Sequence, residues 1–270
     1  MTRQAIVAPV GHVEVNGAQL WVEDTGKGPA VVFVHGGLGD SRLWKPQARA
    51  LADRFRCIRF DLRFFGRSEA PGAAWSAVDD VVGLLDALGV ERAALVGLSM
   101  GGGIVLDVAV AHPDRVWAIA HVAGSVSGLP VNPYTDEQDA VYEAAVERGD
   151  LDAAMAIDFD VWAPLGADDA MRDMWRATPD ARGLPDGAVS RPREPAHERL
   201  DEIGVPTLVI LAAHDPEEFR GVGRTVAHRL PGARLVEVDS DHYLTLREVE
   251  QVDELLLEFL TTAAPKEDCT

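Results

Sequence analysis

Residues 97–101 read Gly-Leu-Ser-Met-Gly and place one serine, Ser99, between two glycines where two apolar segments meet. The run 93–96 before it is typical of a buried strand, and the run 100–106 after it is typical of a packed helix. A strand that passes directly into a helix through Gly-x-Ser-x-Gly holds the serine on a sharp turn, beside the first amides of the helix. The motif alone also fits a glycine-rich turn with an inert serine, so the surrounding sequence has to decide.

Apolar strand-like runs alternate with helix-like segments on both sides of this turn. Such alternation predicts an α/β fold with a mostly parallel sheet of about eight strands and helices on both faces. An Asn16-Gly17 turn between two short runs adds an antiparallel hairpin at the edge. The expected strands are 13–15, 19–23, 31–34, 57–60, 93–96, 116–122, 206–211 and 234–238, and the main helices of the core are 78–88, 222–230 and 249–260.

Between residues 126 and 200 the strand signal stops. Helix-like pieces at 136–148, 151–162 and 167–176 lead into a stretch rich in proline and glycine. The sequence therefore predicts a core domain of residues 1–125 and 201–265, a helical cap insertion of residues 126–200, and a flexible tail of residues 266–270.

Composition excludes several classes of protein. The chain has 270 residues and a formal net charge of −19, which argues against a nucleic-acid partner. We expect no membrane partner, because no run of about 18 apolar residues occurs and the first residues lack the apolar stretch of a signal peptide. Two cysteines, Cys57 and Cys269, give neither a disulfide framework nor a zinc site, which favours a cytoplasmic location. The sequence leaves homodimerisation open.

A serine nucleophile needs a base to take its proton and an acid to orient that base. After an elbow of this kind the acid comes next along the chain and the histidine last, each following a strand. Asp215 follows the strand 206–211, and His242 follows the strand 234–238, so Ser99, Asp215 and His242 form the candidate triad. His214 remains an alternative base, and Glu217, Glu218 or an acid after an earlier strand remains an alternative orienting group.

Acyl transfer also needs backbone amides that face the developing oxyanion. The amide of Met100, at the start of the helix, is one candidate donor, and the amide of Gly37 in the glycine-rich loop after the strand 31–34 is the second. His35 in the same loop is interpreted as a residue that holds the loop by hydrogen bonds. The chemistry requires neither a metal nor an organic cofactor.

Together these motifs resemble the α/β-hydrolase fold superfamily. The matching segments are the loop at 35–37, the segment 61–68, the elbow of Ser99, the strand leading to Asp215, and His242. Residues 84–93 and 97–102 look like those of 3-oxoadipate enol-lactonases and related esterases. One departure is Phe64, which stands where a glycine usually follows the arginine of the 61–68 loop.

The resemblance implies hydrolysis of a small carboxylic ester or lactone, the expected partner, through an acyl-enzyme. The same triad also serves C–C bond hydrolysis, thioester hydrolysis, cofactor-free perhydrolysis and slow ligand-sensing regulators. Epoxide hydrolases on this fold use an aspartate nucleophile, and Ser99 speaks against that chemistry. Aromatic and methionine side chains are candidates for the pocket wall or for plain packing: Trp44, Met155, Phe159, Trp162, Met171 and Trp175.

Overall fold

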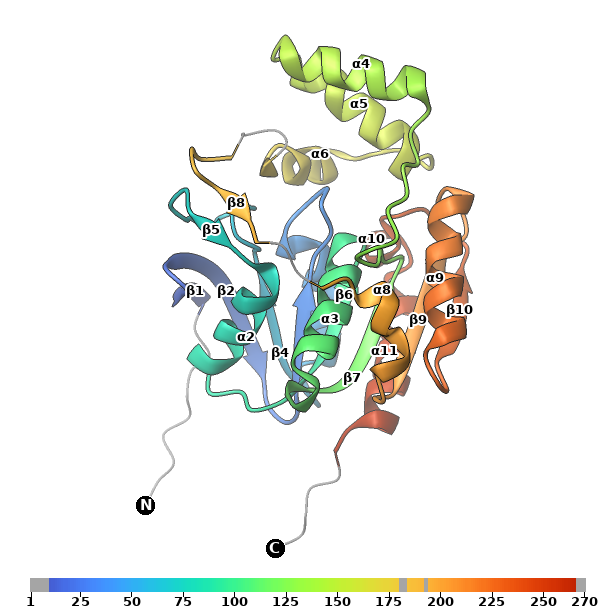
Figure 1. Ribbon diagram of the computed structural model, residues 1–270. Coiled ribbons are helices and arrows are strands. Elements are labelled where there is room, and N and C mark those ends of the chain that lie inside the picture. Colours follow the sequence, from blue (N-terminus) through green and yellow to red (C-terminus); the bar gives the residue numbers. More distant parts are fainter. Residues whose placement is uncertain (1–9, 180–183, 192–193, 266–270) are drawn as a thin grey trace, which may run out of the picture.

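The computed structural model describes residues 10–179, 184–191 and 194–265, and its centre is an eight-stranded sheet (Figure 1). The spatial order is β1-β2-β4-β3-β6-β7-β9-β10. The β1–β2 and β2–β4 pairs are antiparallel and the other pairs are parallel, which confirms the predicted fold class. The strands are β1 (Val10–Val15), β2 (Ala18–Gly26), β3 (Ala30–Val34), β4 (Arg56–Phe60), β6 (Ala93–Leu98), β7 (Val116–Val122), β9 (Thr207–Ala212) and β10 (Arg234–Val238).

The central strands are mostly apolar because both of their faces are covered. Along β3, Val32 and Val34 pack into one core cluster, whereas Val31 and Phe33 pack into the other. The first cluster is covered by α2 (Ala77–Ala87), α3 (Met100–Ala111) and α9 (Glu217–Arg229); the second is covered by α1 (Lys45–Leu51) and α11 (Val249–Ala263).

The parallel strands end at the same edge of the sheet, and this edge gathers the candidate site. The loop at 35–40 follows β3, the loop at 61–68 follows β4, and Ser99 follows β6. Asp215 follows β9 and His242 follows β10. Ligands of open α/β sheets bind outside the carboxyl ends of the strands, so this edge is where a substrate is expected.

The described part of the predicted cap insertion includes helices that lie above the sheet at the top of Figure 1. They are α4 (Asp136–Glu147), α5 (Leu151–Trp162) and α6 (Asp169–Trp175). The Thr135 hydroxyl and the Gln138 side chain form a capping box at the start of α4, and Asp150 caps α5. Local capping thus defines these helices independently of the sheet. Below, "cap" means residues 126–200.

The chain returns to the core through short elements that the sequence did not predict. The two-residue strand β8 (Val189–Ser190) pairs in parallel with β5 (Ala74–Trp75). The helix α8 (Ala196–Arg199) packs against α3 of the core, although the sequence places it within the cap. The predicted tail at 266–270 lies outside the described residues.

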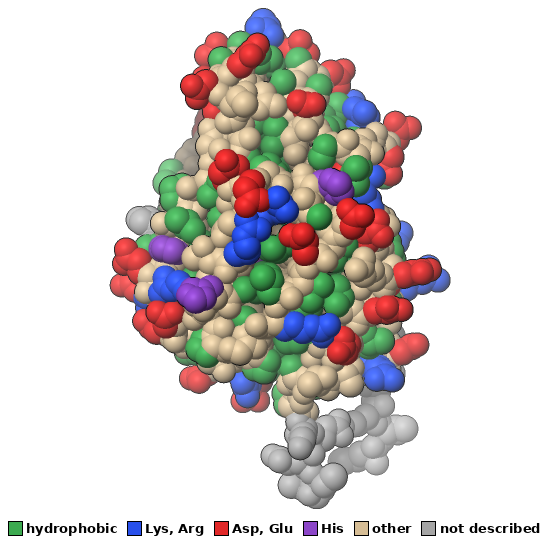
Figure 2. Space-filling model, turned by 90° about the vertical axis from the view of Figure 1, so that its right-hand side faces the viewer, with side chains coloured by type: hydrophobic (Ala, Val, Ile, Leu, Met, Phe, Trp, Pro, Cys, Tyr) green, Lys and Arg blue, Asp and Glu red, His purple; other side chains and the backbone are tan. Residues whose placement is uncertain are grey.

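The charged surface is mixed. Figure 2 shows acidic side chains spread over the visible face with basic ones among them, instead of one acidic patch. Among the described residues, no helix is both long enough and apolar enough to cross a membrane. The same part of the chain holds no group of three or more histidine, cysteine or acidic side chains that could bind a metal.

Candidate active site

Ser99 sits on a strained turn between β6 and α3. Its φ of 55° and ψ of −121° lie outside the ordinary regions for an L residue, as the serine of a nucleophile elbow requires. A Cβ at Gly97 would lie 2.3 Å from the carbonyl oxygen of Gly101, and a Cβ at Gly101 would lie 2.3 Å from that of Val34. The two glycines are therefore needed for the close approach of strand, turn and helix.

The backbone of Ser99 is held on both sides. Its N–H donates to the carbonyl of Val122 at 3.0 Å, and its own carbonyl accepts from the N–H of Gly102 at 2.8 Å and of Ser125 at 3.0 Å. A Cβ at Gly36 would lie 3.1 Å from the Cβ of Ser99, so the loop after β3 touches the serine directly. These bonds offset the strain of the turn and leave the side chain partly exposed.

His242 and Asp215 meet at the edge of the sheet that also carries this turn, from loops that follow adjacent strands. The Nδ1 of His242 lies 2.8 Å from Oδ2 of Asp215, and both side chains are buried. Because a carboxylate only accepts, Nδ1 carries the proton, and Nε2 of the neutral ring keeps its lone pair. The structure therefore brings together the predicted acid and base in the arrangement that a general base needs.

The rival groups lie elsewhere on the surface. The side chain of His214 is 43% exposed, and its Nε2 lies 2.9 Å from Oδ1 of Asp239. Glu217 forms ion pairs with Arg220 and Arg224, and Glu218 is exposed. None of these described contacts reaches the triad.

The loop that would supply an oxyanion donor is fixed by His35. The N–H of Leu62 donates to Nε2 of His35, so Nδ1 of the ring donates to the carbonyl of Gly36. Burial lowers the pKa of His35, which keeps the ring neutral and this pattern intact. A Cβ at Gly37 would meet open space, and Met100 is the first residue of α3, where N–H groups lack intrahelical partners. Both predicted amides therefore have the environment of donors.

Residues 29–248 match the family model described as the alpha/beta hydrolase fold. The chain belongs to the α/β-hydrolase fold family. A 3-oxoadipate enol-lactonase from Acinetobacter baylyi is 24% identical over 256 residues, 92% of each chain. The crystal structure of the enol-lactonase from Burkholderia xenovorans has a TM-score of 0.65 and 27% identity, over 93% of this chain and 99% of that one. An epoxide hydrolase from Caballeronia sordidicola is 37% identical over 146 residues, which span 52% of this chain but only 42% of that protein.

Of the predicted pocket residues in this α/β-hydrolase, Trp162 contacts the triad. Its ring centroid lies 4.4 Å from that of His242. Phe159 packs 5.9 Å from Tyr243, the next residue along the chain from the histidine. Trp44 is fully buried and its indole donates to the carbonyl of Val34, the position of a packing residue. Met155, Met171 and Trp175 are likewise buried in the second core cluster.

Three residues near the base were not among the predicted site residues. Phe219, in the first turn of α9, lies 5.5 Å from the ring of His242. Tyr134, just before α4, hydrogen-bonds the indole of Trp162. Asp241 is buried beside the histidine and accepts from Arg247 at 2.7 Å. The position of Asp241 next to His242 was the one available signal; the others depend on contacts between distant segments.

Phe64 has a backbone conformation that glycine adopts more easily than other residues. Its φ is +72°, in the left-handed region that most side chains avoid. The ring is buried and packs edge-on against Trp75 of β5 at 5.6 Å. The aromatic contact with Trp75, in the strand that pairs with β8, therefore offsets the strain in the backbone of Phe64.

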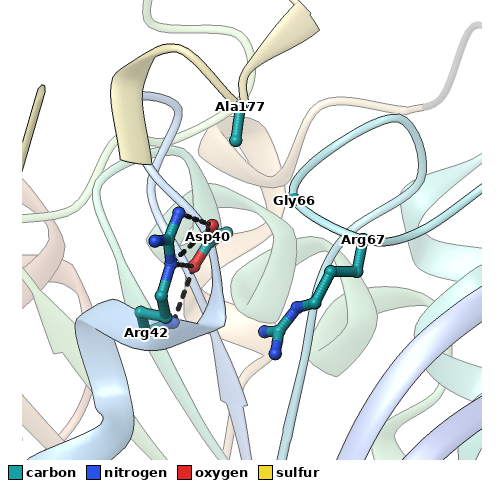
Figure 3. A pocket seen from close by; sticks show the side chains of 5 residues that line it. All are labelled: Asp40, Arg42, Gly66, Arg67 and Ala177. Atoms are coloured by element: carbon teal, nitrogen blue, oxygen red, sulfur yellow. Dashed lines mark hydrogen bonds and ion pairs between the residues drawn. The ribbon is translucent and has the colours of Figure 1, made fainter. Parts of the chain in front are cut away.

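A separate hollow of about 230 Å³ lies between the loops at 40–42 and 66–67 and the residue Ala177. Figure 3 shows Arg42 turned onto Asp40, with Arg67 reaching in from the other side. Arg67 pairs in turn with the buried Asp61 at 2.9 Å. Because each guanidinium already has a buried carboxylate partner, the hollow carries little free charge.

Proposed function

We propose that this protein hydrolyses small carboxylic esters or lactones through an acyl-enzyme formed on Ser99. The observation that carries the proposal is the 2.8 Å bond between His242 and the buried Asp215, at the same edge of the sheet as a serine held on a strained turn. This combination supplies a nucleophile, a base in the required tautomer and an orienting charge. The similarity to enol-lactonases supports the choice of ester and lactone substrates.

In the proposed mechanism, the hydroxyl oxygen of Ser99 attacks the substrate carbonyl while Nε2 of His242 takes its proton. The amides of Gly37 and Met100 donate to the oxyanion of the tetrahedral intermediate. His242 returns the proton to the leaving oxygen, and Asp215 stabilises the charged imidazolium. Water, activated by the same histidine, then releases the acid and restores Ser99.

The part-length similarity to an epoxide hydrolase does not favour epoxide opening. Epoxide hydrolases of this fold use an aspartate nucleophile, and the corresponding turn here carries Ser99. Trp162 and Phe219 flank the base, so the proposed pocket next to it is aromatic. Such a wall suits an apolar acyl or leaving group.

The proposal is tested by assaying the protein against a panel of esters, lactones, thioesters and C–C-cleavage substrates, with Ser99→Ala as the control. We expect steady turnover of at least one ester or lactone, which Ser99→Ala abolishes. A burst of one equivalent followed by near-silence would instead indicate a slow-turnover sensor. Turnover that survives Ser99→Ala would overturn the mechanism.

A further inference from the structure

The end of α5 is bonded to the loop that carries His242. The backbone N–H of His242 donates to the carbonyl of Trp162 at 3.3 Å. Three residues later, the N–H of Leu165 donates to Oδ2 of Asp241 at 3.2 Å. Asp241 directly precedes His242 and is fully buried. Its carboxylate therefore connects the segment that follows α5 to the loop of the histidine. This part of the cap is therefore continuous with the loop of the base.

The ring of Trp162 adds a second contact to the same histidine. Its centroid lies 4.4 Å from that of His242 and 4.9 Å from that of Phe219, which itself lies 5.5 Å from His242. The two aromatic rings thus flank the imidazole. When the imidazole accepts a proton, an aromatic ring at this distance stabilises the cation.

A chain of side-chain hydrogen bonds fixes the far end of Trp162. The indole N–H donates to the hydroxyl oxygen of Tyr134 at 2.8 Å, and this hydroxyl donates to Oδ1 of Asp158 at 2.6 Å. The other oxygen of Asp158 accepts from the indole of Trp175 at 2.6 Å. The direction of each hydrogen bond in this chain is fixed, because an indole only donates and a carboxylate only accepts.

Asp158 is 2% exposed, in a helix whose other buried residues are apolar. A buried carboxylate is costly unless its partners satisfy it, and apolar residues of similar volume often stabilise a fold at least as well. The buried Asp158 is therefore better explained by the orientation that it gives to its partners than by the stability of the cap.

We propose that Tyr134 and Asp158 are positioning residues for the general base: they fix Trp162, and Trp162 fixes His242. The inference rests on the proposed function, in which His242 takes the proton of Ser99. In this proposal, the end of α5 both orients the general base and forms a wall of the proposed substrate pocket.

The first test is Tyr134→Phe, which removes one oxygen atom and keeps the ring. We expect kcat for 4-nitrophenyl acetate to fall about tenfold with KM changed less than twofold, because small displacements of a catalytic group are costly. The rate at which diethyl 4-nitrophenyl phosphate inactivates the enzyme should fall by the same factor, since it reports activation of Ser99 directly. Trp175→Phe removes a donor from the other oxygen of Asp158 but leaves the Trp162–Tyr134 bond, so it tests the same chain further from His242. Its kcat should fall less than that of Tyr134→Phe.

A double-mutant cycle isolates the bond itself. Tyr134→Phe, Trp162→Phe and the double variant are compared by kcat and by thermal midpoint. If the bond between these residues transmits the effect, the double variant loses no more kcat than the worse single variant. Independent, multiplicative losses, or an unchanged kcat in Tyr134→Phe with a lowered thermal midpoint, would overturn the proposal and leave a purely structural role.

Ser99→Ala separates the two proposals. An inactive Ser99→Ala together with a fully active Tyr134→Phe means that the proposed function stands and the positioning role fails. An active Ser99→Ala means that the proposed function fails, and the positioning role with it.

Discussion

The nucleophile turn and the cap approach the same catalytic centre, but they are held in different ways. At the turn, backbone bonds and glycines fix Ser99, and its partners lie in the sheet, in the loop after β7 and in the first turn of α3. In the cap, Trp162 depends on the side chains of Tyr134 and Asp158. The turn is therefore held by backbone contacts, whereas Trp162 in the cap is held by hydrogen bonds between side chains. Variants at the turn should accordingly have larger effects than the tenfold loss expected at Tyr134.

The largest effect tests the serine at the turn. Ser99→Ala should lower kcat/KM by about 10⁶ while the thermal midpoint stays close to that of wild type, because the Cβ and backbone are kept. Ester turnover and thermal melting measure the two quantities. Substantial residual turnover would show that the chemistry lies elsewhere.

The next effect concerns the acid. Asp215→Asn should lower kcat by about 10⁴, since the amide no longer holds the required tautomer of His242 or stabilises its charge. The matched control is Asp239→Asn, which makes the same change at the exposed acid paired with the rival His214. If both variants lose equal activity, or Asp239→Asn alone does, the assignment of acid and base is wrong.

The close packing at the turn is tested by Gly101→Ala. The added methyl group would meet the carbonyl oxygen of Val34 at 2.3 Å, and we expect a loss of about 2–4 kcal/mol in the free energy of unfolding. Gly221→Ala in α9 is the control, because a Cβ there meets nothing within 4 Å and helix propensity favours alanine. Urea unfolding compares the two, and equal stabilities would contradict the packing argument.

The pH dependence of the free energy of unfolding is tested at His121, which is buried in β7. Burial lowers its pKa to about 4, from an unfolded value near 6.5. The folded state thus resists a proton that the unfolded state accepts, so this contribution is present above pH 6.5 and is lost as the pH falls toward 4. It amounts to about 3 kcal/mol in total. Urea unfolding at pH 7 and pH 5 should show a smaller difference in His121→Gln than in wild type; an identical difference would rule out this group as the cause.

The smallest effect concerns the strained backbone of Phe64, in the loop that follows β4. Phe64→Gly and Phe64→Ala both lose the packing against Trp75, but only glycine relieves the positive φ. The glycine variant should therefore be the more stable of the two by about 1 kcal/mol, the reverse of the usual order. Paired urea titrations measure this difference, and a more stable alanine variant would count against backbone strain at this position.

The difference between the turn and the cap also explains which elements and site residues could be predicted from the sequence. The strand Arg234–Val238 and the helix Leu151–Trp162 were predicted at their observed bounds, because strand-like composition and helical spacing are local signals. The candidate triad followed from the order of strands, since parallel strands bring their carboxyl ends to one edge. Its catalytic role stays a prediction, which Ser99→Ala and Asp215→Asn test.

What the sequence did not predict depends on contacts between segments. The strands β5 and β8 have two residues each, too few to show a period of two, and they exist because they pair with each other. Trp162 looked like any aromatic residue at helical spacing, and its contact with His242 depends on a loop 80 residues away. The roles of Tyr134 and Asp158 needed the folded cap for the same reason.

The bond from the N–H of His242 to the carbonyl of Trp162 joins backbone to backbone, so no side-chain replacement can delete it. It sets a design rule for transplanting lids among members of the family. A foreign lid that offers suitable substrate contacts but no carbonyl at this point would leave the loop of His242 without an anchor. In such an exchange, the foreign segment should therefore begin after residue 166, so that α5 of this protein is kept. The specificity can then change without a loss of turnover.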